Sequence, residues 1–575
     1  MHRIHVPRGA LDYGQFGHRS LVAVTLVCGK STQTKSSQIQ NTTGETVTFQ
    51  SGRLASSDAF KTANEWSPYD RSTNPHRMIH KAANQNLPPV HHSASHDFLQ
   101  QNSTNQNVVF PQSGYGSVAA TETFLEETLP VVERKRANFD VSFDDFKRAF
   151  SKKSNWELIR ALSVLRVCSF ESVADHSLKL MSTSQRVLGK TASDWLMKKT
   201  VYGQFVAGET TAEIKEVVSR LQEVNVGPLL AAPMEDDIHT HHPDADKKFD
   251  ANWNTILNGM LLARELDPLY PMTQLKMTAL MPGDLCALLS ERCPHPSQSP
   301  HVVEAVAAAL CGQHLNIDEV FGKGVPDMMK HHLEQGIRRV SEVCKLAICQ
   351  EVIVMVDAEY TYLNPALNLI SLAMMLVCNE PARRSPLIFY TYQNYLQNTR
   401  DVLERDMTFL ENSGVGFATK MVRGAYMYKE RLLACKHGHP DPVHATFDAT
   451  SAAYDSAVTS VLKKMAAKPR HCRMIVASHN EKSALSAVKG IQELDIDPSG
   501  GGVFFGQLMG MADHISCSLG MSGFLARKSL PYGPVTETLP YLSRRAQENK
   551  AIIVGARRER GLLKAELRSR FGIGS

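Results

Sequence analysis

From about residue 227 onward, short runs of apolar residues alternate with longer segments whose apolar positions recur every three to four residues. The runs have the length of buried β-strands, and the longer segments have the period of amphipathic helices. The candidate strands are Gly227–Ala232, Thr273–Leu280, Val352–Ala358, Pro386–Gln393, Gly416–Val422, Arg473–His479, Val503–Gln507 and Ala526–Tyr532. Eight strands separated by helical segments predict an α/β fold, a distorted (β/α)8 barrel of the TIM type.

A helical pattern precedes these strands. Helical periodicity runs through Asp144–Cys168 and Thr191–Val224. Thr210 is followed three residues later by Glu213, which predicts a capping box that opens a helix through Leu221. We therefore expect a helical arm at residues 121–226, ahead of a barrel at residues 227–575.

Residues 1–120 have no sustained apolar period and are rich in Ser, Thr, Gln, Asn and His. Before Glu45 the only acidic residue is Asp12, whereas five residues are basic: Arg3, Arg8, Arg19, Lys30 and Lys35. A serine-rich start with arginines and few acids is typical of a mitochondrial transit peptide. A plain disordered tail is the alternative.

Composition narrows the function classes. The chain is 43% hydrophobic and 21% charged, as in ordinary globular proteins, and its net charge of +5 is too small to favour nucleic-acid binding. The longest apolar runs, such as Leu367–Cys378, fall short of the roughly 20 residues of a membrane span, so any membrane association would be peripheral.

The sequence predicts neither a metal site nor a disulfide framework. The 11 cysteines are scattered between Cys28 and Cys517 without CxxC spacing. The run Asp236–Asp246 is rich in possible metal ligands, but its spacing matches no defined site, and no EF-hand loop occurs. We interpret this run as a polar loop.

Polar residues gather at or near the C-terminal ends of the predicted strands, where barrel enzymes carry their chemistry. They are Lys276, Asp357, Glu359, Gln393, Lys420, Arg423, Ser478, His479, Asn480 and Gln507. This coincidence predicts an enzyme. No GxGxxG follows a strand, so a Rossmann nucleotide domain is not supported. We interpret the triple glycine in Pro498–Gly502 as a turn.

Six stretches resemble the proline dehydrogenase family in order and spacing. They are Val356–Thr361, Thr391–Gln393, Lys420–Tyr426, Ala477–Asn480, Phe505–Leu508 and Tyr541–Glu548. The resemblance covers roughly residues 200–560. It implies a distorted barrel, non-covalently bound FAD, and transfer of electrons to a membrane quinone.

The resemblance also implies a substrate site with three cations. Arg544 and Arg545, on a helical segment with Glu548 four and three residues away, would bind the amino-acid carboxylate. Lys276 would add a third positive charge, and Glu548 would belong to the same site. Because a lone buried carboxylate is costly, we expect Asp357 to pair with Lys276 or one of the arginines.

Further residues are assigned to the cofactor and the substrate ring by resemblance. Lys420 would lie near the N5 edge of the flavin, where some bacterial members have Arg, and Gln393 and Arg423 would contact the flavin ring or the chain beyond it. The other implied FAD contacts are Ser478, His479 and Asn480. Tyr426 and Met421 would pack the substrate ring, although ordinary core packing is the alternative for Met421.

Residue 529 bears on the choice of ring substrate. Proline-preferring relatives resemble K-Y-x-P-Y-G here, whereas this chain has Lys528–Gly533 with Ser529 in place of the tyrosine. Serine leaves space and can hydrogen-bond a hydroxylated ring. Asp357–Pro365 and Val554–Glu559 also look more like the hydroxyproline dehydrogenase branch of the family.

The expected activity is FAD-dependent oxidation of trans-4-hydroxy-L-proline to 3-hydroxy-1-pyrroline-5-carboxylate, with ubiquinone as electron acceptor. The expected location is the mitochondrion, on the matrix side of the inner membrane. Three alternatives stay open: an L-proline dehydrogenase, a Schiff-base lyase that uses Lys276 or Lys420, and a barrel scaffold without activity.

Overall fold

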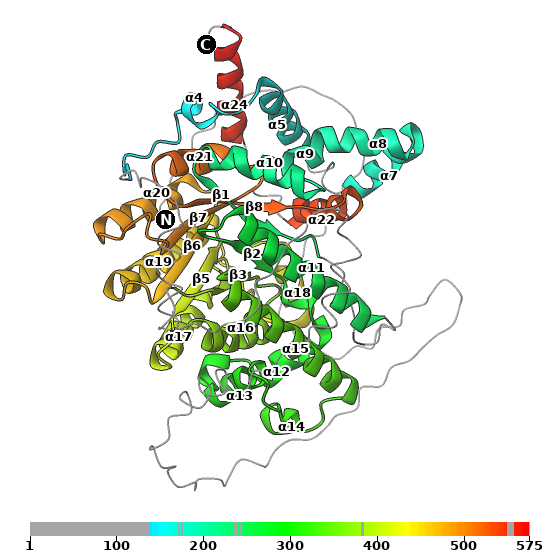
Figure 1. Cartoon of the computed structure of the whole chain (residues 1–575), viewed down its shortest axis with the longest axis vertical. Helices are drawn as coiled ribbons and strands as arrows, with labels where there is room; N and C mark the ends of the chain where they lie inside the picture. The colour runs from blue at the N-terminus through cyan, green and yellow to red at the C-terminus, as the bar shows by residue number, and fades with distance from the viewer. Residues whose placement is uncertain are drawn as a thin grey trace, which may run out of the picture. The chain divides into compact units, whose positions relative to one another are not determined.

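The computed structural model describes residues 137–170, 173, 176–234, 240, 244–380, 385–548 and 557–573, without the side chains of 177–178 and 544–548. Eight parallel strands pair in sequence order and close into a barrel (Figure 1). They are β1 (Val226–Ala231), β2 (Met272–Leu275), β3 (Ile353–Val356), β4 (Ile388–Gln393), β5 (Phe417–Val422), β6 (Cys472–Ala477), β7 (Val503–Leu508) and β8 (Ala526–Pro531). The predicted barrel is confirmed.

The barrel closes where β8 pairs with β1, from Val226 opposite Ala526 to Ala231 opposite Pro531. The strands are buried on both faces, as expected of parallel strands that helices cover on one side and a filled interior on the other.

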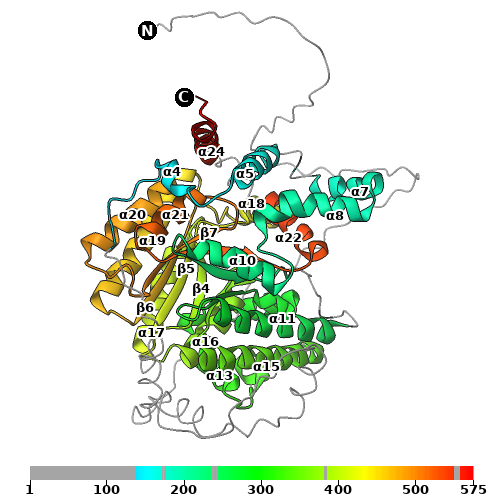
Figure 2. The ribbon, with the colours of Figure 1, turned by 45° about the horizontal axis from the view of Figure 1, so that its top comes forward.

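Helices follow the strands and cover the outside of the barrel (Figures 1 and 2). They are α11 (Ala245–Leu266), α12 (Gly283–Arg292), α13 (Pro300–Leu310), α14 (Ile317–Val320), α15 (Asp327–Gln350), α16 (Asn364–Cys378), α17 (Thr399–Asn412), α18 (Met427–His437), α19 (Phe447–Ala467), α20 (Glu481–Glu493), α21 (Asp513–Met521) and α22 (Val535–Glu548). The connection from β2 to β3 is the longest, because it holds α12 to α15.

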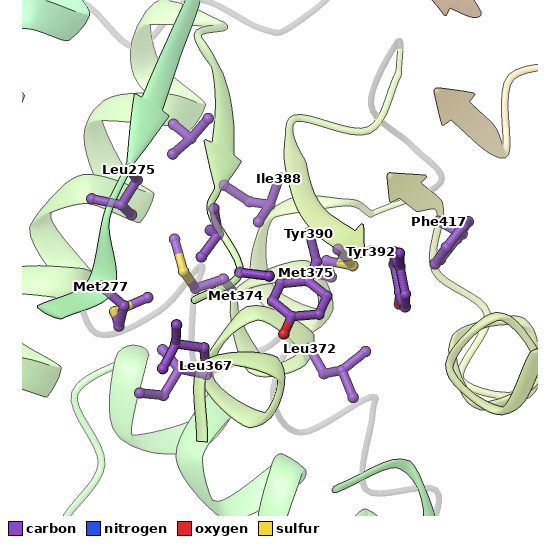
Figure 3. Packing of buried hydrophobic residues seen from close by; sticks show 14 of the residues in the cluster. Leu275, Met277, Leu367, Leu372, Met374, Met375, Ile388, Tyr390, Tyr392 and Phe417 are labelled. Atoms are coloured by element: carbon purple, nitrogen blue, oxygen red, sulfur yellow. The ribbon is translucent and has the colours of Figure 1, made fainter. Parts of the chain in front are cut away.

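Alternate strand residues face outward and inward. Figure 3 shows the outward layer, in which Leu275, Ile388 and Tyr390 pack with side chains of α16 such as Leu367 and Met375. The inward residues form a separate apolar cluster, which fills the lower barrel. Its members are Leu229, Met272, Ile353, Met355, Leu387, Phe389, Ala418, Ile475 and Phe504. The polar residues of the candidate site lie beyond this plug.

The N-terminal end of the barrel is closed by a buried arginine. Arg527 pairs with Asp267 and lies over the rings of Tyr270 and Phe504. Gly227 makes room for it, because a Cβ at this position would come 1.4 Å from the Arg527 Nη1 atom. This end is therefore packed, and the accessible chemistry belongs to the opposite end.

Shorter helices precede the barrel: α4 (Phe146–Ala149), α5 (Asn155–Cys168), α7 (Ser177–Leu188), α8 (Lys190–Met197), a π-helical segment (Lys198–Tyr202), α9 (Gly203–Phe205) and α10 (Thr211–Gln222). The predicted capping box is confirmed, since the Thr210 side chain accepts from Glu213 N and the Glu213 side chain accepts from Thr210 N. A last helix, α24 (Arg557–Arg570), follows α22 in the described part of the chain.

Three predicted elements differ from the structure. Thr191–Val224 is interrupted between α9 and α10, because Val206 is extended and Thr210 caps a new helix. Asp144–Cys168 is not one helix, because α4 ends at Ala149 and Ser154 starts α5 with a capping box of its own. The predicted strand Thr273–Leu280 ends at Leu275, and Met277–Ala279 forms a 3-10 turn. The triple glycine lies in a turn ahead of β7, as expected.

The predicted transit segment and most of the predicted polar loop, at 235–239 and 241–243, lie outside the described residues. The domain limits proposed from the sequence stay predictions.

Candidate active site

A row of inward-facing side chains begins the candidate site. Val356 is opposite Tyr390, and Thr391 is opposite Lys420, so Asp357, directly after β3, lies level with Thr391 of β4 and Lys420 of β5. The Lys420 Nζ atom donates to the Asp357 Oδ1 atom, with Lys420 only 11% exposed. The prediction that Asp357 pairs with Lys276 is therefore wrong, because Lys420 takes that place. The stagger between β3 and β5 selects Lys420 instead. The pairing of Asp357 with Arg544 or Arg545 stays a prediction, since their side chains lie outside the described residues.

Lys276 has a different carboxylate partner. Its Nζ atom lies 3.6 Å from the Glu359 Oε2 atom, and Thr278 Oγ1 donates to Glu359 Oε1 at 2.7 Å. Burial raises the pKa of Glu359, while the nearby Lys276 opposes the rise. The sequence marked Glu359 as a polar strand-end residue without indicating this partner.

Gln393 is oriented by a residue that sequence reasoning missed. The Asn364 Nδ2 atom donates to Gln393 Oε1 at 3.0 Å, while Asn364 Oδ1 accepts from Glu359 N at 2.7 Å. Gln393 Nε2 is left without a partner among the described residues and can donate to a ligand. The only available signal for Asn364 was its place in an Asn-Pro pair soon after a strand.

Arg423 follows β5 and lies among polar and aromatic side chains. It donates to Ser451 Oγ at 2.9 Å and to Ser483 Oγ at 2.8 Å, and its guanidinium lies over the rings of Phe447 and Tyr454. Burial lowers the pKa of Arg423. Its Nε atom is buried without a hydrogen-bond partner in the described structure.

The three residues after β6 have separate local roles. Ser478 Oγ accepts from Asn480 N, and the Asn480 side chain accepts from Ser483 N as the cap of α20. His479 Nε2 accepts from Leu508 N at 3.0 Å. Burial, assisted by Lys528 and His514, lowers the pKa of His479 to about 3. The neutral ring therefore carries its proton on Nδ1, as a donor.

The two predicted ring-packing residues lie in different surroundings. Tyr426 precedes α18, is 9% exposed and lies 4.6 Å from the Tyr360 ring between centroids. Met421 is fully buried in the outer layer and faces away from Lys420, its neighbour on the strand. Met421 therefore supports the wall from outside, contrary to its predicted place against the substrate.

Ser529 faces the barrel interior near the C-terminal end of β8. Its Oγ atom accepts a hydrogen bond from Gln274 Nε2 at 2.9 Å. Gln274 and Lys276 are two residues apart and therefore point to the same side of the chain. Sequence reasoning missed Gln274, although its alternation with Lys276 was a signal. Gln507 faces outward, where its side chain accepts from Ser516.

Arg544, Arg545 and Glu548 lie in the last turns of α22, which begins shortly after β8. Their side chains are outside the described part of the structure, so the predicted carboxylate clamp stays a prediction. The buried face of α22 packs through Val535 and Leu539 on Tyr202 and Val206.

The donors near the strand ends fit FAD. Lys420 and Arg423 supply positive charge, and Gln393 Nε2 and His479 Nδ1 supply neutral donors. The Arg423 Nε atom is buried without a hydrogen-bond partner in the described structure and can donate to a ligand. A flavin dinucleotide offers ring acceptors and two phosphates, which are the matching groups. Among the described residues, no cluster of three or more His, Cys, Asp or Glu side chains could hold a metal ion. No described helix is sufficiently long and apolar to cross a membrane.

Residues 207–558 match the family model described as Proline dehydrogenase. The chain is 42% identical to the hydroxyproline dehydrogenase of Xenopus laevis, covering 75% of this chain and 90% of the relative. It is 28% identical to the human proline dehydrogenase 1, mitochondrial, covering 76% and 90%. A solved proline utilization A from Bdellovibrio bacteriovorus aligns with a TM-score of 0.48 and 21% identity, covering 75% of this chain and 41% of that chain. The chain belongs to the proline dehydrogenase family.

Proposed function

We propose that this protein is an FAD-dependent dehydrogenase that oxidises trans-4-hydroxy-L-proline to 3-hydroxy-1-pyrroline-5-carboxylate and delivers the electrons to ubiquinone. We further propose that it works in the mitochondrion, at the matrix side of the inner membrane. The similarity to a hydroxyproline dehydrogenase and to a mitochondrial proline dehydrogenase 1 supports this assignment.

The contact between Ser529 and Gln274 carries the choice of substrate. The Ser529 Oγ atom accepts from Gln274 Nε2, so its own hydrogen is free for another acceptor. A hydroxyl on the substrate ring is such an acceptor, and it can also donate to the Gln274 Oε1 atom. A pocket with these polar groups favours a hydroxylated ring over a plain one.

The substrate carboxylate would bind to Lys276 together with Arg544 and Arg545 of α22. The contact of Lys276 with Glu359 is long, at 3.6 Å, so the ammonium group can also donate to a second anionic partner. Tyr426 would contact the substrate ring. Because Met421 faces outward, it has no part in this proposal.

Lys420, Arg423, Gln393, Ser478, His479 and Asn480 would hold FAD. When bound, FAD supplies the acceptor for the two electrons that leave the C–N bond of the ring. The Asp357–Lys420 pair would keep the lysine oriented beside it. Asn480 would contribute chiefly by positioning Ser478 and the start of α20.

The substrate amine must lose its proton before its C–N bond is oxidised, so the rate of flavin reduction should rise with pH. His479 would not add a step near neutral pH, because its pKa lies at about 3. A flat pH profile would contradict this part of the proposal.

A Schiff-base lyase is less well supported. Lys276 and Lys420 each contact a carboxylate, whereas a Schiff-base lysine typically has an apolar or cationic environment that activates its amine. Bound flavin absorbance in the purified protein separates the two functions.

Anaerobic flavin bleaching tests the proposal. In wild type, trans-4-hydroxy-L-proline should reduce the flavin with a higher second-order rate constant than L-proline does. Ser529→Tyr should reduce the ratio of the two values by roughly tenfold to a hundredfold, because the ring fills the space for the hydroxyl.

Ser529→Ala is the matched control, since it removes the hydroxyl but keeps the space. It should reduce the ratio less than Ser529→Tyr does. An unchanged ratio in Ser529→Tyr would refute the substrate assignment, and full flavin occupancy without bleaching by either compound would refute the dehydrogenase itself.

A further inference from the structure

We propose that the outer face of the α7–α8 hairpin binds the surface of an anionic phospholipid bilayer. This arm surface consists of Leu180, Val187, Leu188, Trp195 and Leu196. The inference rests on the proposed function, because an enzyme that reduces a membrane quinone must approach the bilayer, and it names the surface that makes the contact.

The hairpin has two apolar faces, and only one is covered in the described structure. On the inner face, Met181 and Met197 pack with Leu539 and Leu542 of α22. On the outer face, Val187 is 76% exposed and Trp195 is 62% exposed. Leu188 and Trp195 border the same open hollow at the turn between the two helices, so the exposed apolar side chains of α7 and α8 meet there. Apolar surface of this kind is a typical mark of an interaction site.

The charges around the arm surface match an anionic bilayer. Between Ser177 and Phe205 the single acidic residue is Asp194, whereas five residues are basic and exposed: Lys179, Arg186, Lys190, Lys198 and Lys199. Lys198 pairs with Glu209, so the other four carry the positive charge of this region. Lys179 and Arg186 each directly precede an apolar residue of the arm surface on α7, so they flank its exposed apolar face. Apolar and aromatic side chains flanked by cations characterise helices that lie in the plane of anionic membranes.

The place of the hairpin also suits this role. It packs on α22, the helix that begins shortly after the C-terminal end of β8, where the candidate active site lies (Figures 1 and 2). Binding through the arm surface would therefore hold the mouth of the barrel close to the membrane that contains the quinone.

Vesicle co-sedimentation of the full-length, FAD-loaded protein tests the proposal. The two probes are vesicles of phosphatidylcholine alone and of phosphatidylcholine with cardiolipin. Wild type should bind the cardiolipin vesicles more tightly, and added salt should weaken this binding. The double variant Val187→Ser, Trp195→Ser should lower the partition constant by about tenfold or more, because two exposed apolar side chains no longer enter the bilayer.

Two further variants make the result specific. Arg186→Glu with Lys190→Glu should remove the preference for cardiolipin. Leu261→Ser with Leu485→Ser changes exposed leucines on α11 and α20, away from the hairpin, and should leave vesicle binding unchanged. All variants should retain wild-type dehydrogenase activity with a water-soluble dye as acceptor. If wild type itself has no such activity, the proposed function is refuted, whatever the result of vesicle binding.

Equal vesicle binding by wild type and the Val187, Trp195 variant would overturn the inference. So would the absence of vesicle binding by wild type. If wild type is a dimer, the Val187, Trp195 variant is a monomer and wild type does not bind vesicles, the surface joins two copies of the chain and the bilayer proposal is wrong.

Discussion

Single residues at the mouth of the barrel are held by partners from other strands. Asp357 pairs with Lys420, Lys276 contacts Glu359, and Gln274 donates to Ser529. Each pair joins side chains that are at least 63 positions apart in the sequence. A substitution at one residue of a pair should therefore change the hydrogen bonding and the position of the other side chain.

Gln274→Met tests this coupling where it bears on specificity. Methionine keeps the length of the side chain but removes the donor to Ser529 and the acceptor for a ring hydroxyl. We expect the ratio of kcat/KM for trans-4-hydroxy-L-proline over L-proline to fall by roughly tenfold, with proline oxidation retained.

Thr273→Val is the control for Gln274→Met, since Thr273 is next to it on β2 but faces the other side of the strand. It should leave the ratio unchanged. If Gln274→Met also leaves it unchanged, Gln274 plays no part in recognising the hydroxyl.

At the scale of elements, a buried carboxylate joins α16, α17 and β4. Asp406 Oδ2 accepts from Asn368 Nδ2 at 2.7 Å and from the Tyr392 hydroxyl at 2.8 Å. Burial raises the pKa of Asp406 to about 6, although these hydrogen bonds oppose the rise. Asp406 Oδ1 and Asn368 Oδ1 are both buried without a hydrogen-bond partner in the described structure.

Asp406→Asn should stabilise the protein above about pH 6. Since the folded pKa is raised, the carboxyl group's contribution is present in acid and is lost as pH rises through about 6. A neutral amide avoids this loss, and we expect a gain of about 1–3 kcal/mol in the free energy of unfolding at higher pH, with little change below about pH 4.

Denaturant unfolding of Asp406→Asn and wild type across this pH range measures the difference. Asp401→Asn, an exposed position on the same helix, should show no such dependence. Equal stability of Asp406→Asn and wild type above pH 6 would mean that the carboxylate is not destabilising there.

Across the whole described molecule, distant segments converge on Asp513 at the start of α21. Its carboxylate lies 2.9 Å from Lys153, which precedes α5, and 2.7 Å from Lys528 of β8. Glu559 of α24 accepts from the backbone N atoms of Ala512 and Asp513. The helices before the barrel, the barrel wall and the last described helix therefore share one polar junction.

Asp513→Asn should destabilise the folded chain by about 3–5 kcal/mol, because it leaves two neighbouring lysines without their carboxylate. Burial alone would raise the pKa of Asp513, but Lys153 and Lys528 lower it below its usual range. The contribution of Asp513 is thus present at neutral pH and lost as pH falls through the folded pKa, so the variant should lose less stability in acid than wild type does.

Thermal unfolding against pH checks this expectation, with the exposed Asp327→Asn as a control. A variant whose melting temperature equals that of wild type at neutral pH would show that the junction does not couple the segments.

The sequence alone determined the eight strands, their order and the capping box at Thr210, because these depend on local periodicity and nearest neighbours. The prediction from sequence was wrong where the same alternation of residues fits both a strand and a turn. Met277 and Ala279 continue the alternation of β2, yet the chain turns there because β2 and β3 stop pairing at Leu275 and Val356, and the backbone bonds to itself instead.

Only the tertiary structure decided which charges meet and which apolar residues stay uncovered. The stagger of the barrel strands places Lys420 beside Asp357. Because side chains alternate along β5, Met421 faces the outer layer and lies outside the site. The packing of α7 and α8 on α22 left Trp195 and Val187 exposed. These outcomes depend on contacts between segments far apart in the chain, which no local pattern of residues contains.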